Sequence, residues 1–526
     1  MSSFVIRIDG RDVEVAPGQT VLAAARQLGL DIPTLCYLEK CGPLTTCLVC
    51  LVKINGRLVP SCGTKAVPGM VVESETEEVH TARRTALELL FSDHVGDCLS
   101  PCNLLCPLQL NIPVMIRQIE SGAVTAAAAT VRAALPLPAV LGRLCHHPCE
   151  KGCRRGAAEA PAAIRDMERF AADYDLTQAI PQPVSRPEPT GRRVAIVGAG
   201  PTGLAAAFYL VRQGHAVELL DRHATPGGSL RQEAETALPP AVLASELVRL
   251  MALGLRFHPT SELGGTRDVT SLKAEYDAVV LALGEIPAGE MAALGAPFTP
   301  AGLKVDPHTC ATEMRGVFAA GALVKPVKQL VRAMAEGKAV AECVGLFLRG
   351  AVVRRSDKPF SSLMGRLEPT ELKAFLERGS GQPRGPGCHA CNMGLTSTAA
   401  AGEASRCLDC DCTSSGQCGL QHYAQRYQAD AGRFRSKRRP FEQVVQPGGV
   451  IFEPGKCILC GICVKLTELA REPLGLTFIG RGFDVRVGAP LNHTITDGLQ
   501  RVADEVVREC PTGALTYDRH AAVISD

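Results

Sequence analysis

Apolar and polar residues alternate over residues 4–15, on both sides of Gly10, as they do in a β-hairpin. Residues 20–28 follow with a capping threonine and the apolar spacing of a short helix. Near the middle of the chain, residues 194–197 form a continuous apolar run that is followed at once by glycines, as at the end of a buried strand. The pattern therefore predicts an N-terminal domain of sheet and helix, and a later strand, glycine turn and helix.

Composition divides the rest of the chain. Residues 80–175 are rich in alanine and helical in pattern, and the proline-rich residues 181–189 are typical of a stiff linker. We expect a multi-domain protein of α/β and α+β class. The expected boundaries divide it into residues 1–85, 86–180, 190–350, 351–440 and 441–526.

Charge and hydropathy exclude some classes of partner. The chain has 56 basic and 54 acidic residues and a net charge of +2, so nothing in its charge favours nucleic acid. The N-terminus lacks the pattern of a signal peptide, and no apolar stretch approaches the roughly 20 residues that span a bilayer. We therefore expect a cytoplasmic protein that does not itself insert into a membrane.

The cysteines indicate metal. The chain has 23 of them in 526 residues, grouped a few residues apart, whereas disulfide frameworks belong to short secreted domains. The first group has the spacing C-x10-C-x2-C-x11-C and resembles the N-terminal 2Fe-2S domain of the large iron–sulfur subunit of respiratory complex I and of related hydrogenase and dehydrogenase subunits. A zinc site is the alternative, and Cys41 in the same loop is interpreted as a bystander. The predicted ligands are Cys36, Cys47, Cys50 and Cys62.

Two cysteine triplets follow, within residues 98–106 and 145–153. They resemble the helical N-terminal domain of the glutamate synthase small subunit and of dihydropyrimidine dehydrogenase, which holds two 4Fe-4S clusters with interleaved ligands. Two clusters need eight ligands, and only six cysteines are present. His94 stands where that family has its first cysteine, and Glu168 where relatives use Gln or Glu; the alternatives are a loop histidine and a solvated helix face. The resemblance implies one cluster on His94, Cys98, Cys102 and Cys153 and another on Cys106, Cys145, Cys149 and Glu168.

Two more groups lie near the C-terminus. One, which loosely resembles the His- and Cys-ligated segment of the complex I subunit, ends in Cys-x-Leu-Gln; Cys388 and Cys391 could replace two of its members, and zinc is again an alternative. The other places three cysteines on one tight turn and adds a remote Cys-Pro, which is ferredoxin ligation of a single 4Fe-4S cluster. Thr467 stands where a two-cluster ferredoxin would place its next cysteine. The predicted ligands are Cys407, Cys410, Cys412 and Cys418, then Cys457, Cys460, Cys463 and Cys510.

The apolar run at 194–197 leads into a GxGxxG fingerprint, in which glycines allow a tight turn and close approach of a pyrophosphate to a helix N-terminus. Together with two later segments it resembles the FAD domain of the glutamate synthase small subunit, although Leu283 and Ala322 depart from the family pattern. An empty structural Rossmann domain is the alternative. The residues predicted to bind FAD are Gly198, Gly200, Pro201, Gly203, Asp221, Gly227, Gly228, Gly284 and Gly321.

Those relatives insert a second Rossmann domain for NADPH where this chain has only residues 285–315. The resemblances imply a ubiquitin-like 2Fe-2S ferredoxin domain (1–85), a helical domain with two 4Fe-4S clusters (86–180), a Rossmann-like FAD domain (190–350), a linker with a cysteine-rich 4Fe-4S segment (351–440) and a 4Fe-4S ferredoxin-like domain (441–526). The implied cofactors are FAD, one 2Fe-2S cluster and up to four 4Fe-4S clusters. FAD exchanges electron pairs while clusters carry single electrons, so we expect an electron-transfer subunit of a multi-subunit oxidoreductase that is catalytic only within its complex. The expected partners are an NADH-oxidising flavoprotein, a formate dehydrogenase or a hydrogenase. The alternatives are a self-sufficient glutamate synthase-like NAD(P)H oxidoreductase and a zinc-stabilised scaffold.

Overall fold

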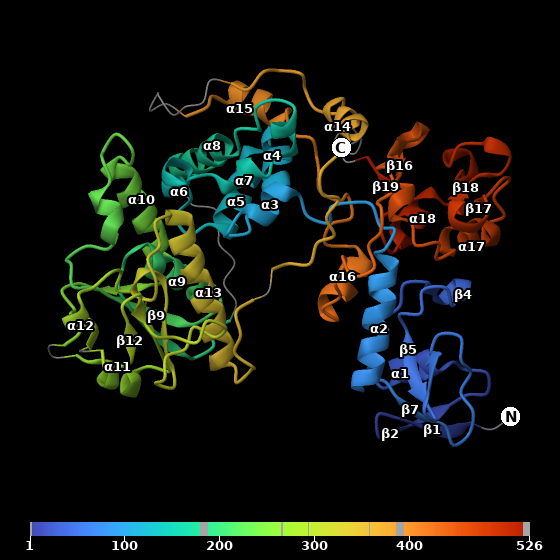
Figure 1. Ribbon diagram of the computed structural model, residues 1–526, viewed down its shortest axis with the longest axis horizontal. Helices are drawn as coiled ribbons and strands as arrows, with labels where there is room; N and C mark the ends of the chain where they lie inside the picture. The colour runs from blue at the N-terminus through green and yellow to red at the C-terminus, as the bar shows by residue number, and fades with distance from the viewer. Residues whose placement is uncertain are drawn as a thin grey trace. The chain divides into compact units, whose positions relative to one another are not determined.

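The computed structural model describes residues 3–178, 188–264, 267–292, 294–356, 358–385 and 394–518. The chain folds into two compact units (Figure 1). The first unit comprises Met1–Ser100, Pro359–Lys373 and Cys410–Asp526, and the second comprises Pro101–Lys358 and Ala374–Asp409. The chain therefore leaves the first unit after Ser100 and returns to it twice.

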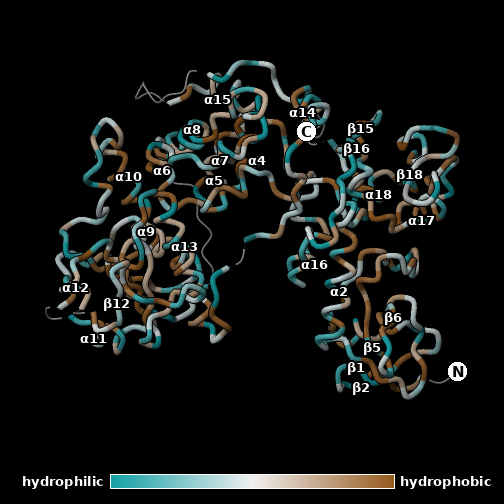
Figure 2. Tube along the Cα trace, viewed as in Figure 1, coloured by the Kyte–Doolittle hydropathy of each residue, from teal (hydrophilic) through white to brown (hydrophobic). Residues whose placement is uncertain are grey.

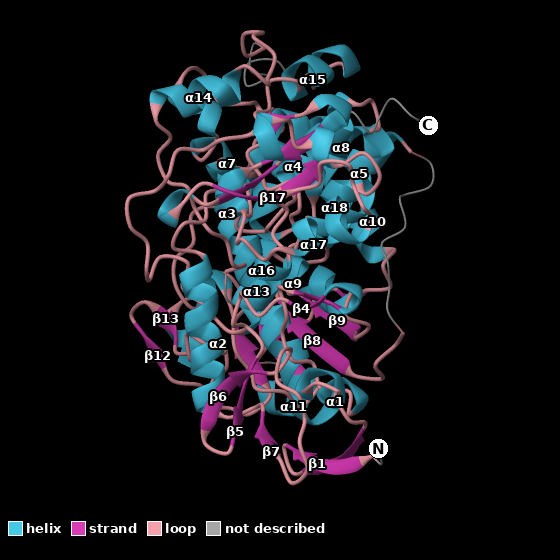
Figure 3. Ribbon diagram, turned by 90° about the vertical axis from the view of Figure 1, so that its right-hand side faces the viewer, coloured by secondary structure: helices cyan, strands magenta, loops and turns pink. Residues whose placement is uncertain are grey.

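The N-terminal part of the first unit is a five-stranded sheet in the order β2-β1-β7-β5-β6 (Figure 3). Strands β1 and β2 form the hairpin that the alternation predicts, with Phe4 opposite Val15 and Ile8 opposite Arg11. Helix α1 (Val21–Gln27) begins at Thr20, whose side chain accepts a hydrogen bond from the Ala23 N–H and so satisfies one free donor of the first turn. The strands are β1 (Phe4–Ile8), β2 (Arg11–Val15), β5 (Leu51–Ile54), β6 (Arg57–Pro60) and β7 (Val71–Glu73).

Helix α2 (Glu77–Leu90) joins this sheet to the C-terminal part of the same unit. It packs against α16 (Gly419–Arg426), and the Arg83 guanidinium donates to the Tyr427 hydroxyl at 2.8 Å. At the other end of α2, the buried Glu88 carboxylate accepts hydrogen bonds from the Asp430 N–H and the Arg433 side chain. These contacts hold together two segments that lie more than 300 residues apart in the sequence.

The helices and strands in the remainder of the first unit are short. A three-stranded sheet has the order β15-β16-β19, and a separate hairpin pairs β17 with β18. Helices α17 and α18 pack against each other, and α18 packs against β19. The elements are β15 (Val444–Val445), β16 (Val450–Phe452), α17 (Ile462–Leu469), β17 (Thr477–Ile479), β18 (Arg486–Gly488), α18 (Ala503–Glu509) and β19 (Leu515–Tyr517), and the N-terminal part adds the short pair β3 (Tyr37–Leu38) and β4 (Gly42–Pro43).

The second unit begins with a helical layer. Helix α6 crosses α8 so closely that a Cβ on Gly142 would lie 2.7 Å from the Arg169 Cα, and α5 also packs on α8. A buried ion pair between Arg132 and Asp175 fixes α5 to α8. The helices are α3 (Pro101–Leu105), α4 (Ile112–Glu120), α5 (Val124–Ala134), α6 (Pro138–Leu144), α7 (Pro148–Lys151) and α8 (Ile164–Thr177). No single helix in the described ranges is long and apolar enough to cross a membrane, and α5 with α6 passes that test only as a pair bent by 87°.

A parallel sheet in the order β10-β9-β8-β11-β14 forms the rest of the second unit, as the glycine fingerprint predicts. Its central strands are mostly apolar and buried, as in β8 after Arg193 and throughout β11, because helices cover both faces of such a sheet. Helix α9, largely apolar in Figure 2, packs against α13. The elements are β8 (Arg193–Val197), α9 (Pro201–Val211), β9 (Ala216–Leu220), α10 (Pro240–Met251), β10 (Arg256–His258), α11 (Val269–Glu275), β11 (Ala278–Leu281), α12 (Ala288–Ala292), β12 (Phe298–Thr299), β13 (Gly302–Leu303), β14 (Val317–Ala319) and α13 (Leu330–Leu348), followed by α14 (Pro369–Leu376) and α15 (Ser397–Ala404).

Between β11 and β14, where relatives of the predicted family carry a second nucleotide domain, the connection is short. The described residues 285–292 and 294–315 contain only helix α12 and the two-residue strands β12 and β13. This part of the chain contains no second parallel sheet among its described residues.

The contact between α9 and α13 depends on Gly337. A Cβ at this position would lie 2.3 Å from the Thr202 carbonyl oxygen and 2.8 Å from the Ala205 Cβ. We expect Gly337→Ala to lower the free energy of unfolding by about 1–3 kcal/mol, since overpacking forces the helices apart. Urea denaturation followed by circular dichroism measures the change.

Gly402, at an exposed position of helix α15, is the matched control, because a Cβ there meets nothing within 4 Å. Gly402→Ala should stabilise the protein by up to about 1 kcal/mol through helix propensity alone. Equal effects of the two substitutions would contradict the steric account.

Candidate redox centres

The four cysteines of the first group lie together beside the N-terminal sheet. Cys36 precedes β3, Cys47 and Cys50 precede β5, and Cys62 follows β6, and all four are buried. Hydrogen bonds from Cys47 and Cys62 hold the pKa of Cys36 well below its ordinary value, and Cys62 acts in the same way on the pKa of Cys50. The structure thus brings the four predicted 2Fe-2S ligands together. Cys41 has other neighbours, and burial raises its pKa.

The last cysteine group lines one small cavity. Cys457, Cys460 and Cys463 enter it from the turn before α17 and from its first residues, and Cys510 enters from the end of α18. Burial, with the neighbouring Cys457 and Cys510, raises the pKa of Cys463 to about 12. Cys460 is buried and the other three cysteines are half-buried. Four such thiols around one cavity are a poor arrangement for a metal-free protein and a suitable one for iron, which binds thiolates.

A third cavity lies in the helical layer of the second unit. Cys106, Cys145, Cys149 and Glu168 line it, so these four predicted ligands lie together. Glu168 belongs to α8, and burial raises the pKa of its carboxyl group to about 8. Its Oε1 atom is buried without a hydrogen-bond partner among the described residues. A buried carboxylate oxygen with no protein partner fits a metal ligand better than the solvated helix face that was the alternative.

The other predicted quartet of the helical layer is divided. His94 and Cys98 belong to the first unit, and Cys102 and Cys153 belong to the second. Within the first unit, the Cys98 thiol lies 3.3 Å from the Ser362 hydroxyl and within electrostatic range of Cys412.

The fourth group is divided too. Cys412 and Cys418 lie in the first unit, near Cys98, whereas Cys407 lies in the second unit after Arg406, whose carbonyl oxygen accepts a hydrogen bond from Arg155. Cys410 begins the last segment of the first unit. Cys388 and Cys391 lie outside the described residues.

His94 has the environment of a neutral imidazole. Burial and the nearby Lys456 ammonium lower its pKa to about 3, and the Phe91 ring packs edge-on against it. Its Nδ1 atom is buried and finds no hydrogen-bond partner in the described part of the chain. The neutral ring is the form that binds metals.

No group of three or more His, Cys, Asp or Glu side chains in the described ranges is arranged around a single metal ion. A cuboidal 4Fe-4S cluster is bound through separate iron atoms, so its ligands do not converge on one point.

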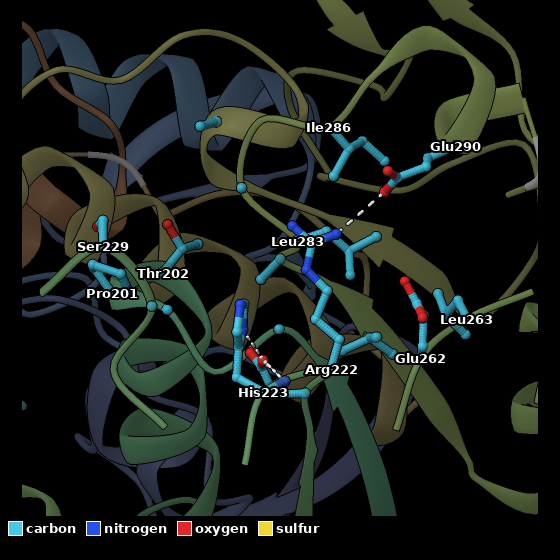
Figure 4. A pocket seen from close by; sticks show the side chains of 18 of the residues that line it. Pro201, Thr202, Arg222, His223, Ser229, Glu262, Leu263, Leu283, Ile286 and Glu290 are labelled. Carbon is cyan, nitrogen blue, oxygen red and sulfur yellow. Dashed lines mark hydrogen bonds and ion pairs between the residues drawn. The ribbon is translucent and has the colours of Figure 1, made fainter. Parts of the chain in front are cut away.

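A cavity of about 290 Å³ opens at the carboxyl ends of the parallel strands (Figure 4). Gly198 has φ = +107°, and a Cβ there would lie 2.3 Å from the Ala282 carbonyl oxygen. A Cβ on Gly203 would lie 1.8 Å from the Gly198 carbonyl oxygen, so the turn requires both glycines. Gly200 is different, since it lines the cavity and a Cβ there meets nothing within 4 Å. The space in front of Gly200 and the N-terminus of α9 is thus open for a phosphate.

The other predicted glycines and Pro201 shape the same cavity. Pro201, Gly228 and Gly284 line it. The Gly227 N–H donates to the Ala199 carbonyl oxygen at 2.8 Å, and a Cβ on Gly321 would lie 2.4 Å from the Thr202 hydroxyl.

Asp221 lies at the end of β9, where the sequence places a ribose-binding acid. Its carboxylate accepts hydrogen bonds from the Ala199 N–H at 2.6 Å and from the His223 N–H at 2.8 Å, and these bonds fix its orientation toward the cavity. Figure 4 shows Arg222 joined to Glu290 of α12, an ion pair of 3.5 Å. Sequence reasoning missed Arg222, His223 and Glu290. Only their location in the sequence could have indicated them, because residues just after a parallel strand line the ligand crevice of such a sheet.

Comparison with known families agrees with this geometry. Residues 2–77 match the 2Fe-2S iron-sulfur cluster binding domain, and residues 74–180 match dihydropyrimidine dehydrogenase domain II, 4Fe-4S cluster. Residues 156–337 match the pyridine nucleotide-disulphide oxidoreductase family. The chain joins two iron–sulfur domains to a dinucleotide-binding oxidoreductase domain. These are the modules of iron–sulfur and flavin-type oxidoreductase subunits.

Curated relatives match only part of the chain. The NADP(+)-dependent formate dehydrogenase subunit beta of Moorella thermoacetica is 35% identical over 35% of this chain and 29% of its own length. The NAD-dependent dihydropyrimidine dehydrogenase subunit PreT of Salmonella typhimurium is 36% identical over 35% of this chain and 45% of its own. A chain of an NAD+-reducing [NiFe]-hydrogenase crystal structure is 40% identical over 18% of this chain and 40% of that one, at a TM-score of 0.17, which supports no structural argument. The chain thus spans less than half the length of each.

The glycine turn provides a test of dinucleotide binding that separates folding from binding. Gly200→Ala places a methyl group in open space, so we expect an unchanged urea midpoint for the cofactor-free protein but dinucleotide binding weakened about tenfold or more, equivalent to roughly 1.4 kcal/mol. Equilibrium titration of the cofactor-free protein with FAD measures the affinity.

Gly203→Ala is the contrasting variant, because its methyl group would collide with the Gly198 carbonyl oxygen. This substitution should lower the urea midpoint itself. If Gly200→Ala binds FAD as tightly as the unaltered chain, the cavity does not hold the pyrophosphate as described.

Proposed function

We propose that this protein is an FAD- and iron–sulfur-containing electron-transfer subunit of a larger oxidoreductase. It would pass electrons between a partner that handles electron pairs and another redox site, through the flavin and a chain of clusters. The partner would be an NADH-oxidising flavoprotein, a formate dehydrogenase or a hydrogenase. The cytoplasmic location stays a prediction.

The observation that carries the proposal is that cysteine groups far apart in the sequence share one hydrophobic core in the first unit. Cys36, Cys47, Cys418 and Cys460 all belong to that core. The Thr46 hydroxyl, one residue before Cys47, donates to the Cys460 carbonyl oxygen at 3.3 Å. Direct contact between loops that hold different groups suits single-electron transfer from one cluster to the next.

The same core links the remaining group. The Gly419 N–H, next to Cys418, donates to the Pro511 carbonyl oxygen at 2.9 Å, and Pro511 follows Cys510. On its other side, Gly419 approaches Leu35, the neighbour of Cys36, with a distance of 3.1 Å from an ideal Cβ to the Leu35 side chain. Hydrogen bonds and side-chain packing therefore join the loops of all three groups in the first unit.

The dinucleotide cavity supports FAD as the two-electron group. Its glycine turn and Asp221 suit the pyrophosphate and ribose of FAD, which would accept or deliver electron pairs when bound. The short connection at 285–315 contains no second glycine fingerprint. This favours a subunit that receives electrons from a partner over the alternative, a self-sufficient glutamate synthase-like NAD(P)H oxidoreductase.

Anaerobic purification with quantification of iron, sulfide and flavin tests the cofactor content. We expect about 18 irons per chain, from 2 for one 2Fe-2S cluster and 4 × 4 for four 4Fe-4S clusters, together with one FAD. Zinc in place of much of the iron would contradict the proposal.

Visible spectra recorded after addition of NADH or NADPH test whether the isolated chain accepts electrons directly from a nicotinamide nucleotide. The isolated chain should stay oxidised with either nucleotide and become reduced when the co-purifying dehydrogenase subunit is added. Dithionite, which reduces flavin and clusters directly, is the control for competent cofactors. Rapid reduction of the isolated chain by NADH or NADPH would instead establish the self-sufficient oxidoreductase.

A further inference from the structure

Two pairs of possible metal ligands, more than 300 residues apart in the sequence, both lie in the first unit. His94 and Cys98 lie just before the chain leaves that unit at Ser100, and Cys412 and Cys418 lie just after it returns at Cys410. The whole second unit is thus inserted between the pairs. The contacts of α2 with α16, including Arg83 with Tyr427, hold the base of this insertion together.

The segment Pro359–Lys373, which returns to the first unit between the two pairs, contacts both of them. The Ser362 hydroxyl donates to the Gly96 carbonyl oxygen at 2.7 Å, and the Ser362 N–H donates to the Cys98 sulfur at 3.4 Å. The Phe360 carbonyl oxygen accepts a hydrogen bond of 3.2 Å from Gln421, three residues after Cys418. This segment therefore joins the turn at His94 and Cys98 to the start of α16.

The four donors also lie near one another. The Cys412 thiol is within electrostatic range of Cys98 and of Cys418, and the Cys418 thiol is within range of Cys98. His94 joins them through Lys456, which contacts the turn at Gly96 beside the imidazole and donates a hydrogen bond to Cys412. Lys456 is itself buried at 4% exposure and paired with Glu453. A buried cation at the sulfur donors offsets the negative charge that thiolates bring to a desolvated site.

From this arrangement we infer that His94, Cys98, Cys412 and Cys418 bind one 4Fe-4S cluster, assembled from two sequence segments on either side of the inserted second unit. One imidazole and three thiolates complete the four ligands that such a cluster takes. The unpartnered Nδ1 of His94 fits this role. The grouping differs from the one that the sequence suggests, and it leaves Cys102, Cys153 and Cys407 in the second unit as donors for another cluster.

The inference rests on the proposed function for the presence of clusters, but it concerns which residues share one. Iron content of anaerobically purified variants of the full chain tests it. His94→Ala and Cys412→Ala should each lose about four irons, and the double variant should lose the same four, because both remove one cluster. His94→Ala combined with Cys102→Ala should lose about eight. Cys41→Ala, a buried cysteine of the same unit outside all donor sets, is the control and should keep all of its iron.

Electron paramagnetic resonance separates ligand loss from misfolding. His94→Cys keeps four ligands and adds a negative charge, so the iron count should hold while the midpoint potential of one cluster signal falls. Cys412→Ser should perturb that same signal. The grouping is overturned if His94→Ala retains its iron, if the His94 and Cys412 losses add to eight, or if the two conservative variants alter different signals. In each of those cases the unaltered chain would still show about 18 irons and partner-dependent reduction, so the proposed function would stand.

Discussion

The contacts between α2 and α16 determine the organisation of the first unit. Arg83 and Glu88 of α2 are both buried, and a buried guanidinium or carboxylate is stable only when other groups satisfy it. Tyr427, Asp430 and Arg433, which follow the inserted second unit in the sequence, supply those partners. Burying these polar groups without their partners would cost free energy. The segment of α2 and the segment at residues 419–433 therefore pack together, and the cysteines near them are brought close as well.

The donor groups themselves impose the second constraint. Burial and neighbouring thiols raise the pKa values of Cys460 and Cys463. At His94 and Glu168, an imidazole nitrogen and a carboxyl oxygen are buried without a hydrogen-bond partner among the described residues. Such arrangements cost free energy in the absence of metal, and they become favourable when iron takes the place of protons. Cluster binding and folding should therefore be linked in this chain, and the shared core of the first unit should lose order when its clusters are removed.

In the second unit, the packing of β8, α9 and α13 depends on backbone segments that approach each other closely at glycines. Gly198, Gly203 and Gly337 each stand where a Cβ would collide with a carbonyl oxygen at 2.3 Å or less. These three contacts bring β8, α9 and α13 close enough to form the end of the dinucleotide cavity. Gly200 lies among them for another reason, since the space before it belongs to the ligand rather than to the protein.

The sequence by itself predicted two cysteine groups and a glycine turn whose members the structure brings together, but it also grouped Cys407 with Cys412 and Cys418, which the structure divides between the two units. Spacing placed Cys36 to Cys62 after a hairpin, Cys457 to Cys463 on a tight turn and Gly198 to Gly203 between strand and helix, because local geometry follows directly from residue order. Arg222 and Glu290 could not be predicted in this way, since they meet only when the loops after separate strands fold over the same cavity. The grouping of His94 and Cys98 with Cys412 and Cys418 was equally beyond local reasoning. The family resemblance assigned His94 to cysteines near it in the sequence, whereas the inferred grouping depends on Cys412 and Cys418, which only the tertiary structure brings close to Cys98.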